Sequence, residues 1–148
     1  MKAGTTSAPN TDLVTAIRHL HKAIAGGGVD QRLLSLVHLR ASQINGCAPC
    51  VFAGVAAAKK AGETEQRLHN VVAWRETPFT DEERAALLLT EAVTRIQDGA
   101  AGVTDEIWDA AAGHFTGEQL NAIILEIALT NFFNRINRAT REQAGKTW

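Results

Sequence analysis

Apolar residues recur every three or four positions along most of this chain, the spacing that places them on one face of an α-helix. The first such segment follows the polar run Asn10–Asp12, whose side chains can cap a helix N-terminus. Its apolar positions are Leu13, Ile17, Leu20 and Ile24. Three glycines at 26–28 make continuation costly and therefore predict the end of this helix.

A second helix is predicted after Asp30, with an apolar face made of Leu33, Leu34, Val37, Ala41 and Ile44. Asn45 and Gly46 end it, since glycine readily adopts the left-handed conformation that follows a helix. A third helix continues to Lys60 and carries Pro49 in its first turn, where the missing N–H has no intrahelical partner to lose.

The second half of the chain also consists of predicted helices separated by breaks. Thr80 and Glu83 form a capping box that opens a strongly apolar helix. The expected elements are a helix over about 63–74, a break at 77–80, a helix over 81–96, a glycine loop at 99–102, a helix over about 105–112, and a long helix from Thr116 through Ile136. We therefore predict an all-α bundle of about six to seven helices in a single domain over residues 1–148.

Charge and hydropathy exclude several function classes. The formal net charge is −1 and no basic run is longer than Lys59–Lys60, so we expect no nucleic-acid partner. No apolar stretch approaches the roughly 20 residues that span a bilayer, and the first ten residues lack the apolar middle of a signal peptide. We expect no membrane association and a cytoplasmic location.

The feature that most directly indicates a chemical function is the pair Cys47 and Cys50, the only cysteines in the chain. A bridge across two intervening residues constrains the unfolded chain little, so redox exchange or metal ligation is the expected use. Zinc needs about four ligands. The histidines show paired spacing only at His19 and His21, so we expect neither a metal nor another cofactor.

Cys47 and Cys50 stand where the third helix begins, and free amides and the helix dipole stabilise an anion there. This position lowers a cysteine pKa, and the thiolate is the reactive form. One sulfur could attack a peroxide or disulfide while the other resolves the product. The alternative is that both cysteines serve as small buried apolar residues.

The chain resembles the AhpD-like alkylhydroperoxidases of the carboxymuconolactone decarboxylase superfamily. The matching segments are LVHLRASQINGCAPCV, AWRETPFTDEERAALLLTEAVTRI, HFTGEQL and ALTNFFNRIN. The resemblance implies an all-α homo-oligomer (dimer, trimer or hexamer) that reduces organic hydroperoxides with electrons from a dithiol donor. It also implies that Cys50 is the peroxidatic cysteine and that Cys47 resolves and exchanges electrons.

Two positions depart from the family pattern Glu-x11-Cys-x2-Cys-x3-His, in which the Glu and His form a proton relay. Ser35 stands at the glutamate position and Gly54 at the histidine position. Without the relay, the pKa of Cys50 should lie nearer the ordinary value of about 8.5. A glycine within a helix weakens it by about 1 kcal/mol, so Gly54 suggests that a ligand or another helix packs closely there.

Other residues could replace the relay. His38 lies on nearly the same helix face as Ser35 and could act as a base, or it could be an exposed or interface histidine. Glu91 could supply a carboxylate. The stripe of Asn131, Asn134 and Asn137 is expected to satisfy backbone groups or an interface.

Three hypotheses follow. The first is a thiol peroxidase in which Cys50 attacks and Cys47 resolves, with an altered proton relay. The second assigns the attack to Cys47, because the first cysteine at a helix start is usually more exposed. The third is a catalytically diminished scaffold or small-molecule-binding oligomer. The redox hypotheses require two sulfurs that can meet and that reagents can reach.

Overall fold

The computed structural model describes residues 10–96 and 102–145. Within these ranges the chain forms seven α-helices and one 3₁₀ helix and no strand, so the predicted all-α class is confirmed. The helices are α1 (Thr11–Ala25), α2 (Gln31–Ile44), α3 (Ala48–Lys60), α4 (Glu65–Asn70), η1 (Val71–Glu76), α5 (Asp81–Thr94), α6 (Asp105–Ala112) and α7 (Gly117–Thr140). The predicted glycine loop lies outside the described residues except for Gly102, as do the first nine residues and the last three.

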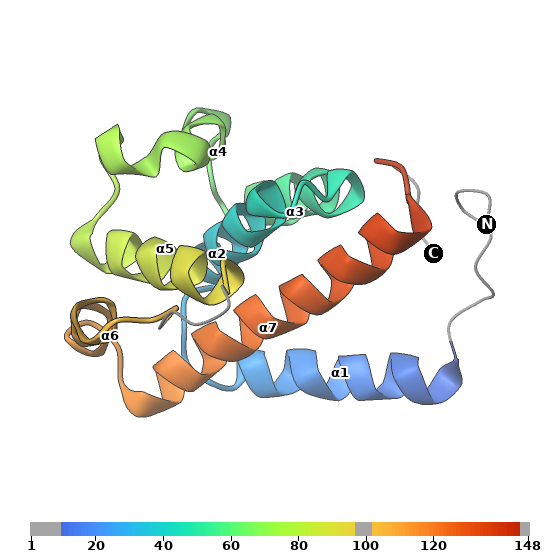
Figure 1. The fold of residues 1–148 in the computed structure, drawn as a ribbon, viewed down its shortest axis with the longest axis horizontal. Coiled ribbons are helices and arrows are strands. Elements are labelled where there is room, and N and C mark those ends of the chain that lie inside the picture. The colour runs from blue at the N-terminus through green and yellow to red at the C-terminus, as the bar shows by residue number, and fades with distance from the viewer. Residues whose placement is uncertain (1–9, 97–101, 146–148) are drawn as a thin grey trace.

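Helix α2 is the centre of the fold and packs against α3, α5 and α7. Figure 1 shows the long helix α7 crossing the molecule beside α1, with α3 and α5 on its other side. Two apolar clusters fill the interior. One joins α2 to α1, α5, α6 and α7, and the other joins α2 to α3, η1 and α5.

Local capping explains where most helices begin. Asn10 and Asp30 each accept a hydrogen bond from a backbone amide two residues later, at the starts of α1 and α2. Thr80 and Thr116 each form a complete capping box, with Glu83 and Gln119 respectively. These starts agree with the prediction because the capping groups lie next to one another in the sequence.

Two predicted boundaries are wrong. The helix expected over 63–74 divides into α4 and η1, with a non-helical Ala73 (φ −118°, ψ 38°). This kink comes beside the buried Trp74, whose indole N–H donates to Glu91 on α5. Helix α5 ends at Thr94 rather than Ile96, and the Ile96 side chain is 74 % exposed, so no burial holds it in the helix.

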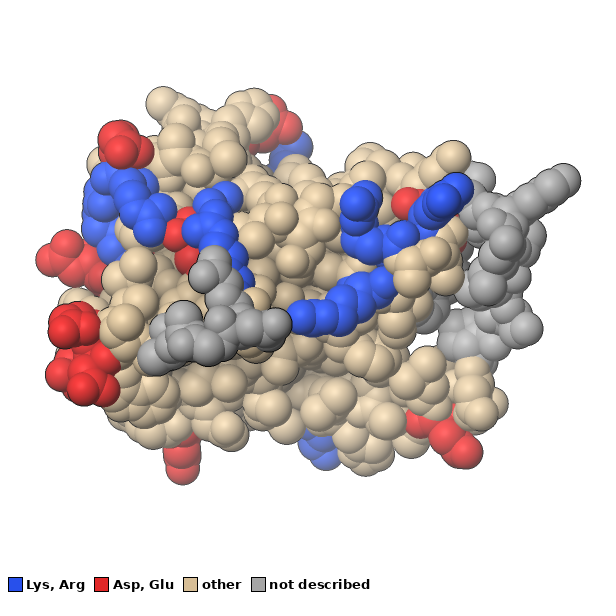
Figure 2. Space-filling model, viewed as in Figure 1, with Lys and Arg blue, Asp and Glu red and all other residues tan. Residues whose placement is uncertain are grey.

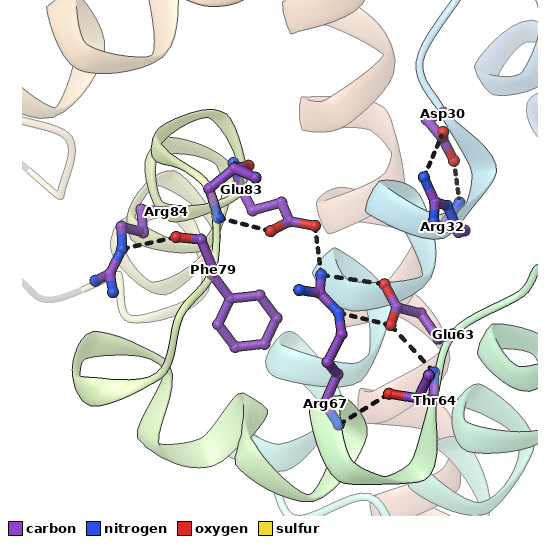
Figure 3. A network of polar contacts seen from close by, with 9 residues as sticks. Asp30, Arg32, Glu63, Thr64, Arg67, Phe79, Glu83 and Arg84 are labelled. Carbon is purple, nitrogen blue, oxygen red and sulfur yellow. Dashed lines mark hydrogen bonds and ion pairs between the residues drawn. The ribbon is translucent and has the colours of Figure 1, made fainter.

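Arg67 on α4 connects this short helix to its surroundings (Figure 3). Its guanidinium bonds to Glu63, just before α4, and to Glu83 in the first turn of α5. It also lies 4.6 Å from the centre of the Phe79 ring. These contacts hold the α4 segment against α5. They thereby help to position the buried Trp74 of η1, the helix that follows α4 directly.

Charged side chains of both signs are dispersed over the face seen in Figure 2, with wide uncharged areas between them. In the described part of the chain, no helix is both long and apolar enough to cross a membrane. An apolar groove of about 280 Å³ lies between α1 and α7, lined by Leu13, Ala16, Ile17, Leu20, Leu125, Ala128, Leu129 and Phe132.

Candidate active site

Cys47 and Cys50 are joined by a disulfide at the N-terminus of α3. Cys47 is the N-cap residue and Cys50 is the third residue of the helix. The turn that precedes them is fixed by Gly46 (φ +62°), and the Cys47 amide donates to the Ser42 carbonyl. The sequence predicted both this helix start and two sulfurs close enough to meet.

The disulfide is almost closed to solvent. Cys47 is 0 % exposed and Cys50 is 5 % exposed. Two grooves nevertheless include Cys47 in their walls. One is an apolar groove of about 570 Å³, lined by Gln43, Gly46, Cys47, Ala48, Val51, Phe52, Val55 and Ala144, and the other has a volume of about 180 Å³ and includes Asn137, Arg138 and Arg141. The expectation of an exposed first cysteine is therefore wrong for the oxidised form.

Asn137 on α7 contacts both sulfurs. Its Nδ2 lies 3.2 Å from Cys50 Sγ and 3.8 Å from Cys47 Sγ, and the residue is 8 % exposed. Its Oδ1 is buried and has no hydrogen-bond partner among the described residues. The sulfurs of the helix-start dithiol therefore face the amide group of a residue about 90 positions later in the chain.

The rest of the asparagine stripe lies in the same interior. The Asn45 side chain donates to both Asn131 and Asn134 at 2.9 Å, and Asn134 donates to Ser42 at 3.2 Å. The amide of Asn131 also donates to the Ile127 carbonyl. These bonds tie α7 to the end of α2, directly before the cysteines.

His38 on α2 lies beside the backbone of Cys50. Its Nε2 is 3.2 Å from the Cys50 carbonyl oxygen and its Nδ1 is 3.2 Å from Thr130 Oγ1. The Glu126 carboxylate lies 3.7 Å from Nδ1, and the His38 side chain is 25 % exposed. Because a carbonyl only accepts, Nε2 must be the donor in this contact, and a ring protonated only there would accept a hydrogen bond from the Thr130 hydroxyl at Nδ1.

Gly54 on α3 lies directly against the His38 ring. A Cβ atom at Gly54 would lie 2.7 Å from His38 Cδ2 and 3.2 Å from His38 Nε2. The close neighbour suggested by this glycine is therefore another helix, represented by the His38 ring. An imidazole from α2 occupies the space that any side chain at position 54 would need.

Ser35 and Glu91 have structural partners of other kinds. The Ser35 hydroxyl donates to the Gln31 carbonyl of its own helix at 2.8 Å. Glu91 accepts hydrogen bonds from Arg40, Trp74 and Arg75 at 2.7–2.8 Å. Burial acts to raise the pKa of Glu91, but hydrogen bonds from Arg75, Trp74 and Arg40 outweigh it and lower the pKa to about 2.

The carboxylate beside His38 therefore belongs to Glu126, whereas Glu91 links α2, η1 and α5. Sequence reasoning missed Glu126 and Thr130, and it gave Asn137 a general polar role. All three lie on α7, four and seven residues apart, so they share one helix face. That periodicity was a usable signal, but only the packing of α7 relates it to the cysteines.

Over residues 10–96 and 102–145, no group of three His, Cys, Asp or Glu side chains is placed to hold an ion. The site offers instead a disulfide, an amide with one unpaired end, and an imidazole beside a carboxylate.

Comparison with known proteins gives consistent matches. The model of the carboxymuconolactone decarboxylase family matches residues 11–92. The uncharacterized protein YdfG of Bacillus subtilis is 36 % identical over 126 residues, which cover 84 % of each chain. The uncharacterized protein YnjA of Escherichia coli is 33 % identical over 113 residues, covering 75 % of this chain and 60 % of YnjA.

Solved structures share the fold. The Agrobacterium tumefaciens protein ATU0492, of unknown function and suggested to be the antioxidant defence protein AhpD, superposes with a TM-score of 0.84 at 33 % identity, covering 93 % of this chain and 94 % of that one. The debrominase Bmp8 superposes with a TM-score of 0.78 at 24 % identity, covering 90 % of this chain and 71 % of Bmp8. The second likeness concerns the fold alone.

Proposed function

The chain belongs to the carboxymuconolactone decarboxylase family, and on that premise we propose that it is a thiol peroxidase that reduces organic hydroperoxides through Cys47 and Cys50. The observation that carries the proposal is a closed disulfide between these residues at a helix N-terminus. A helix N-terminus stabilises a thiolate once the bond is reduced. The apolar groove beside Cys47 suits the organic part of such a substrate.

We assign the proton relay to His38 and Glu126. In a neutral His38 ring that donates from Nε2, Nδ1 is the nitrogen without a proton, so a proton would be gained there in place of the hydrogen bond from Thr130, and Glu126 at 3.7 Å would balance the resulting charge. Gly54 stands where the family pattern has its relay histidine. This replacement supports the assignment, because the His38 ring from α2 fills the space beside α3 that Gly54 leaves open. Ser35 needs no relay role in this scheme.

The proposed reaction begins with the reduced protein. The Cys50 thiol releases its proton to His38 through solvent, and the thiolate attacks the terminal oxygen of the hydroperoxide. An S–O bond forms, the O–O bond breaks, and the leaving alkoxide takes back the proton that His38 received and departs as an alcohol. The Cys47 thiol then loses its proton and attacks the sulfenic sulfur of Cys50, which forms the disulfide and releases water.

A dithiol donor restores the starting state by thiol–disulfide exchange. One donor sulfur attacks Cys47, the S–S bond of the protein breaks, and the second donor sulfur releases the mixed disulfide. Two electrons pass to the protein and the donor leaves oxidised. We place the attack at Cys47 because both grooves include Cys47 in their walls and neither includes Cys50.

Cumene hydroperoxide tests the proposal directly. The reduced protein should lose two thiols per molecule of hydroperoxide and release one molecule of cumyl alcohol. Cys50→Ser should abolish the reaction, whereas Cys47→Ser should stop at a sulfenic acid on Cys50 that dimedone traps. Trapping on Cys47 in Cys50→Ser would instead support attack by the first cysteine.

The relay has its own test. His38→Ala should slow thiol oxidation by about 100-fold, the usual effect of losing a general acid–base group. His69→Ala is the matched control, because His69 lies exposed on α4. An equal rate in wild type and His38→Ala would remove His38 from the mechanism while leaving the cysteine assignment in place.

One observation favours a second candidate function. The near-complete burial of both sulfurs is what a scaffold or small-molecule-binding oligomer without catalysis would show. That candidate predicts peroxide reactivity no greater than that of a simple free thiol. The titration above separates the two, since a free-thiol rate in the wild type would decide for the scaffold.

Assembly and location belong to the same proposal. The apolar groove between α1 and α7 suits a homo-oligomer contact, and a dimer, trimer or hexamer would cover it. A dithiol donor is available in a reducing compartment, so we place the protein in the cytoplasm. Sedimentation of the purified chain tests the assembly.

A further inference from the structure

The unpaired oxygen of Asn137 has no explanation in the oxidised protein. Its Oδ1 is buried without a partner among the described residues, although its Nδ2 bonds to both sulfurs. A buried acceptor left unpaired destabilises the folded state, and few are left so in folded proteins. The amide is assigned with Nδ2 toward the sulfurs, because a disulfide sulfur carries no proton and only the nitrogen end can donate to it.

Reduction of the disulfide would supply the missing partner. Breaking the S–S bond with two electrons and two protons gives two thiols, and release of one proton leaves a thiolate beside a thiol. The amide N–H groups of Asn137 can donate to the thiolate, and its Oδ1 can accept the S–H of the remaining thiol. Both ends of the amide are then hydrogen-bonded. In the oxidised state this is impossible, because a disulfide has no S–H that could donate to Oδ1.

The distances indicate which sulfur holds the charge. Nδ2 lies 3.2 Å from Cys50 Sγ and 3.8 Å from Cys47 Sγ. A hydrogen bond to a charged acceptor is stronger than one to a neutral acceptor, so the nearer sulfur gains more by becoming the thiolate. The third residue of α3 also lies in the first helical turn, where the dipole acts in the same direction.

We propose that Asn137 is a catalytic residue that stabilises the Cys50 thiolate by donating hydrogen bonds from Nδ2 and accepts a hydrogen bond from the Cys47 thiol at Oδ1. This inference rests on the proposed function and answers which cysteine attacks. The other titratable or charged groups near the pair are His38 on α2, Glu126 on α7 and, around the smaller groove, Arg138, Arg141 and Glu142. The variants below leave all of them unchanged.

The test is the pH dependence of alkylation of the fully reduced, full-length protein by iodoacetamide. Fragmentation mass spectrometry assigns the label, because no Lys or Arg lies between Cys47 and Cys50 for trypsin to cut. Asn137→Leu removes both polar ends at similar size. It should lower the rate of labelling at Cys50 at neutral pH by about tenfold or more, from the strength of a hydrogen bond to a charge.

Asn137→Asp should lower that rate further, because a carboxylate beside the thiolate repels it. Thr140→Val is the matched control, since Thr140 lies one turn later on α7 and its hydroxyl donates, within the described part of the chain, to backbone carbonyls of its own helix. Its labelling profile should match that of the wild type. In the oxidised state Asn137→Leu should unfold at the same or a higher urea concentration, because it removes an unpaired buried oxygen.

Two outcomes of the labelling experiment would overturn the inference. One is a labelling profile of Cys50 that is unchanged in Asn137→Leu, and the other is an effect confined to Cys47. Alkylation needs no peroxide, so the inference can hold when peroxide reduction fails. Conversely, peroxide reduction with normal rates in Asn137→Leu would retain the proposed function and reject the role of Asn137.

Discussion

Replacing Gly54 with alanine probes the contact between α2 and α3 that underlies the proposed relay. In an ordinary helix interior this substitution stabilises, by about 1 kcal/mol. Here the added Cβ would lie 2.7 Å from His38 Cδ2, closer than carbon atoms approach one another, so the imidazole must move. The ring is not free to do so without loss, because both of its nitrogens are hydrogen-bonded.

The magnitudes favour destabilisation. Overpacking of a filled interior costs about 1–3 kcal/mol, and each hydrogen bond lost from His38 costs about 1 kcal/mol. After the gain in helix propensity, Gly54→Ala should destabilise the protein by about 1–3 kcal/mol. In a His38→Ala background the obstacle is gone, so the same change should stabilise by about 0.5–1 kcal/mol.

Urea denaturation of the oxidised wild type, both single variants and the double variant measures this reversal of sign. The coupling free energy between positions 38 and 54 should reach about 2 kcal/mol, within the range seen for residues in contact. Gly54→Ala that stabilises both backgrounds equally would refute the reasoning, since it would mean that His38 does not occupy the space beside Gly54 in solution.

Two further predictions concern stability. The pKa of Glu91 is lowered to about 2 in the folded protein, so this carboxylate contributes stability above its ordinary pKa of 4.5 that is lost as the pH falls toward 2. Glu91→Gln leaves the Arg40 charge buried without its partner and should lower the free energy of unfolding by about 3–5 kcal/mol at pH 7. In urea denaturation the variant should also lose less stability than the wild type between pH 4.5 and 2. Parallel stability profiles of wild type and variant over this pH range would contradict the assignment. Reduction of the Cys47–Cys50 disulfide should cost no more than about 2 kcal/mol, because the closed loop is so short. A loss above about 4 kcal/mol on adding a phosphine reductant would show a structural role instead.

Local features were predictable from the sequence and distant ones were not. The caps at Asn10, Thr80 and Thr116 form between residues that are neighbours in the chain, so their patterns predicted the helix starts. The end of α5 and the kink at Ala73 depend on burial and on contacts with other helices. Propensity alone placed both incorrectly.

In the candidate site, too, local features were predictable and contacts between distant residues were not. The spacing of Cys47 and Cys50 predicted their meeting at a helix start, and Gly54 indicated a close neighbour. The identity of that neighbour and the contacts of Asn137 depend on how α2 and α7 lie against α3. No local pattern encodes these packing relations, because the partners are 12 or more residues apart.

Because the contact between Cys50 and Asn137 spans 87 residues, the dithiol leaves the ribosome well before the helix that encloses it. At about 5–20 residues per second, translation of that interval takes several seconds or longer. During this time the nascent thiols lack their cover, and alkylating reagents or small disulfides should reach them far more readily than in the finished protein. Protection of the two cysteines therefore reports the moment at which the last helix docks.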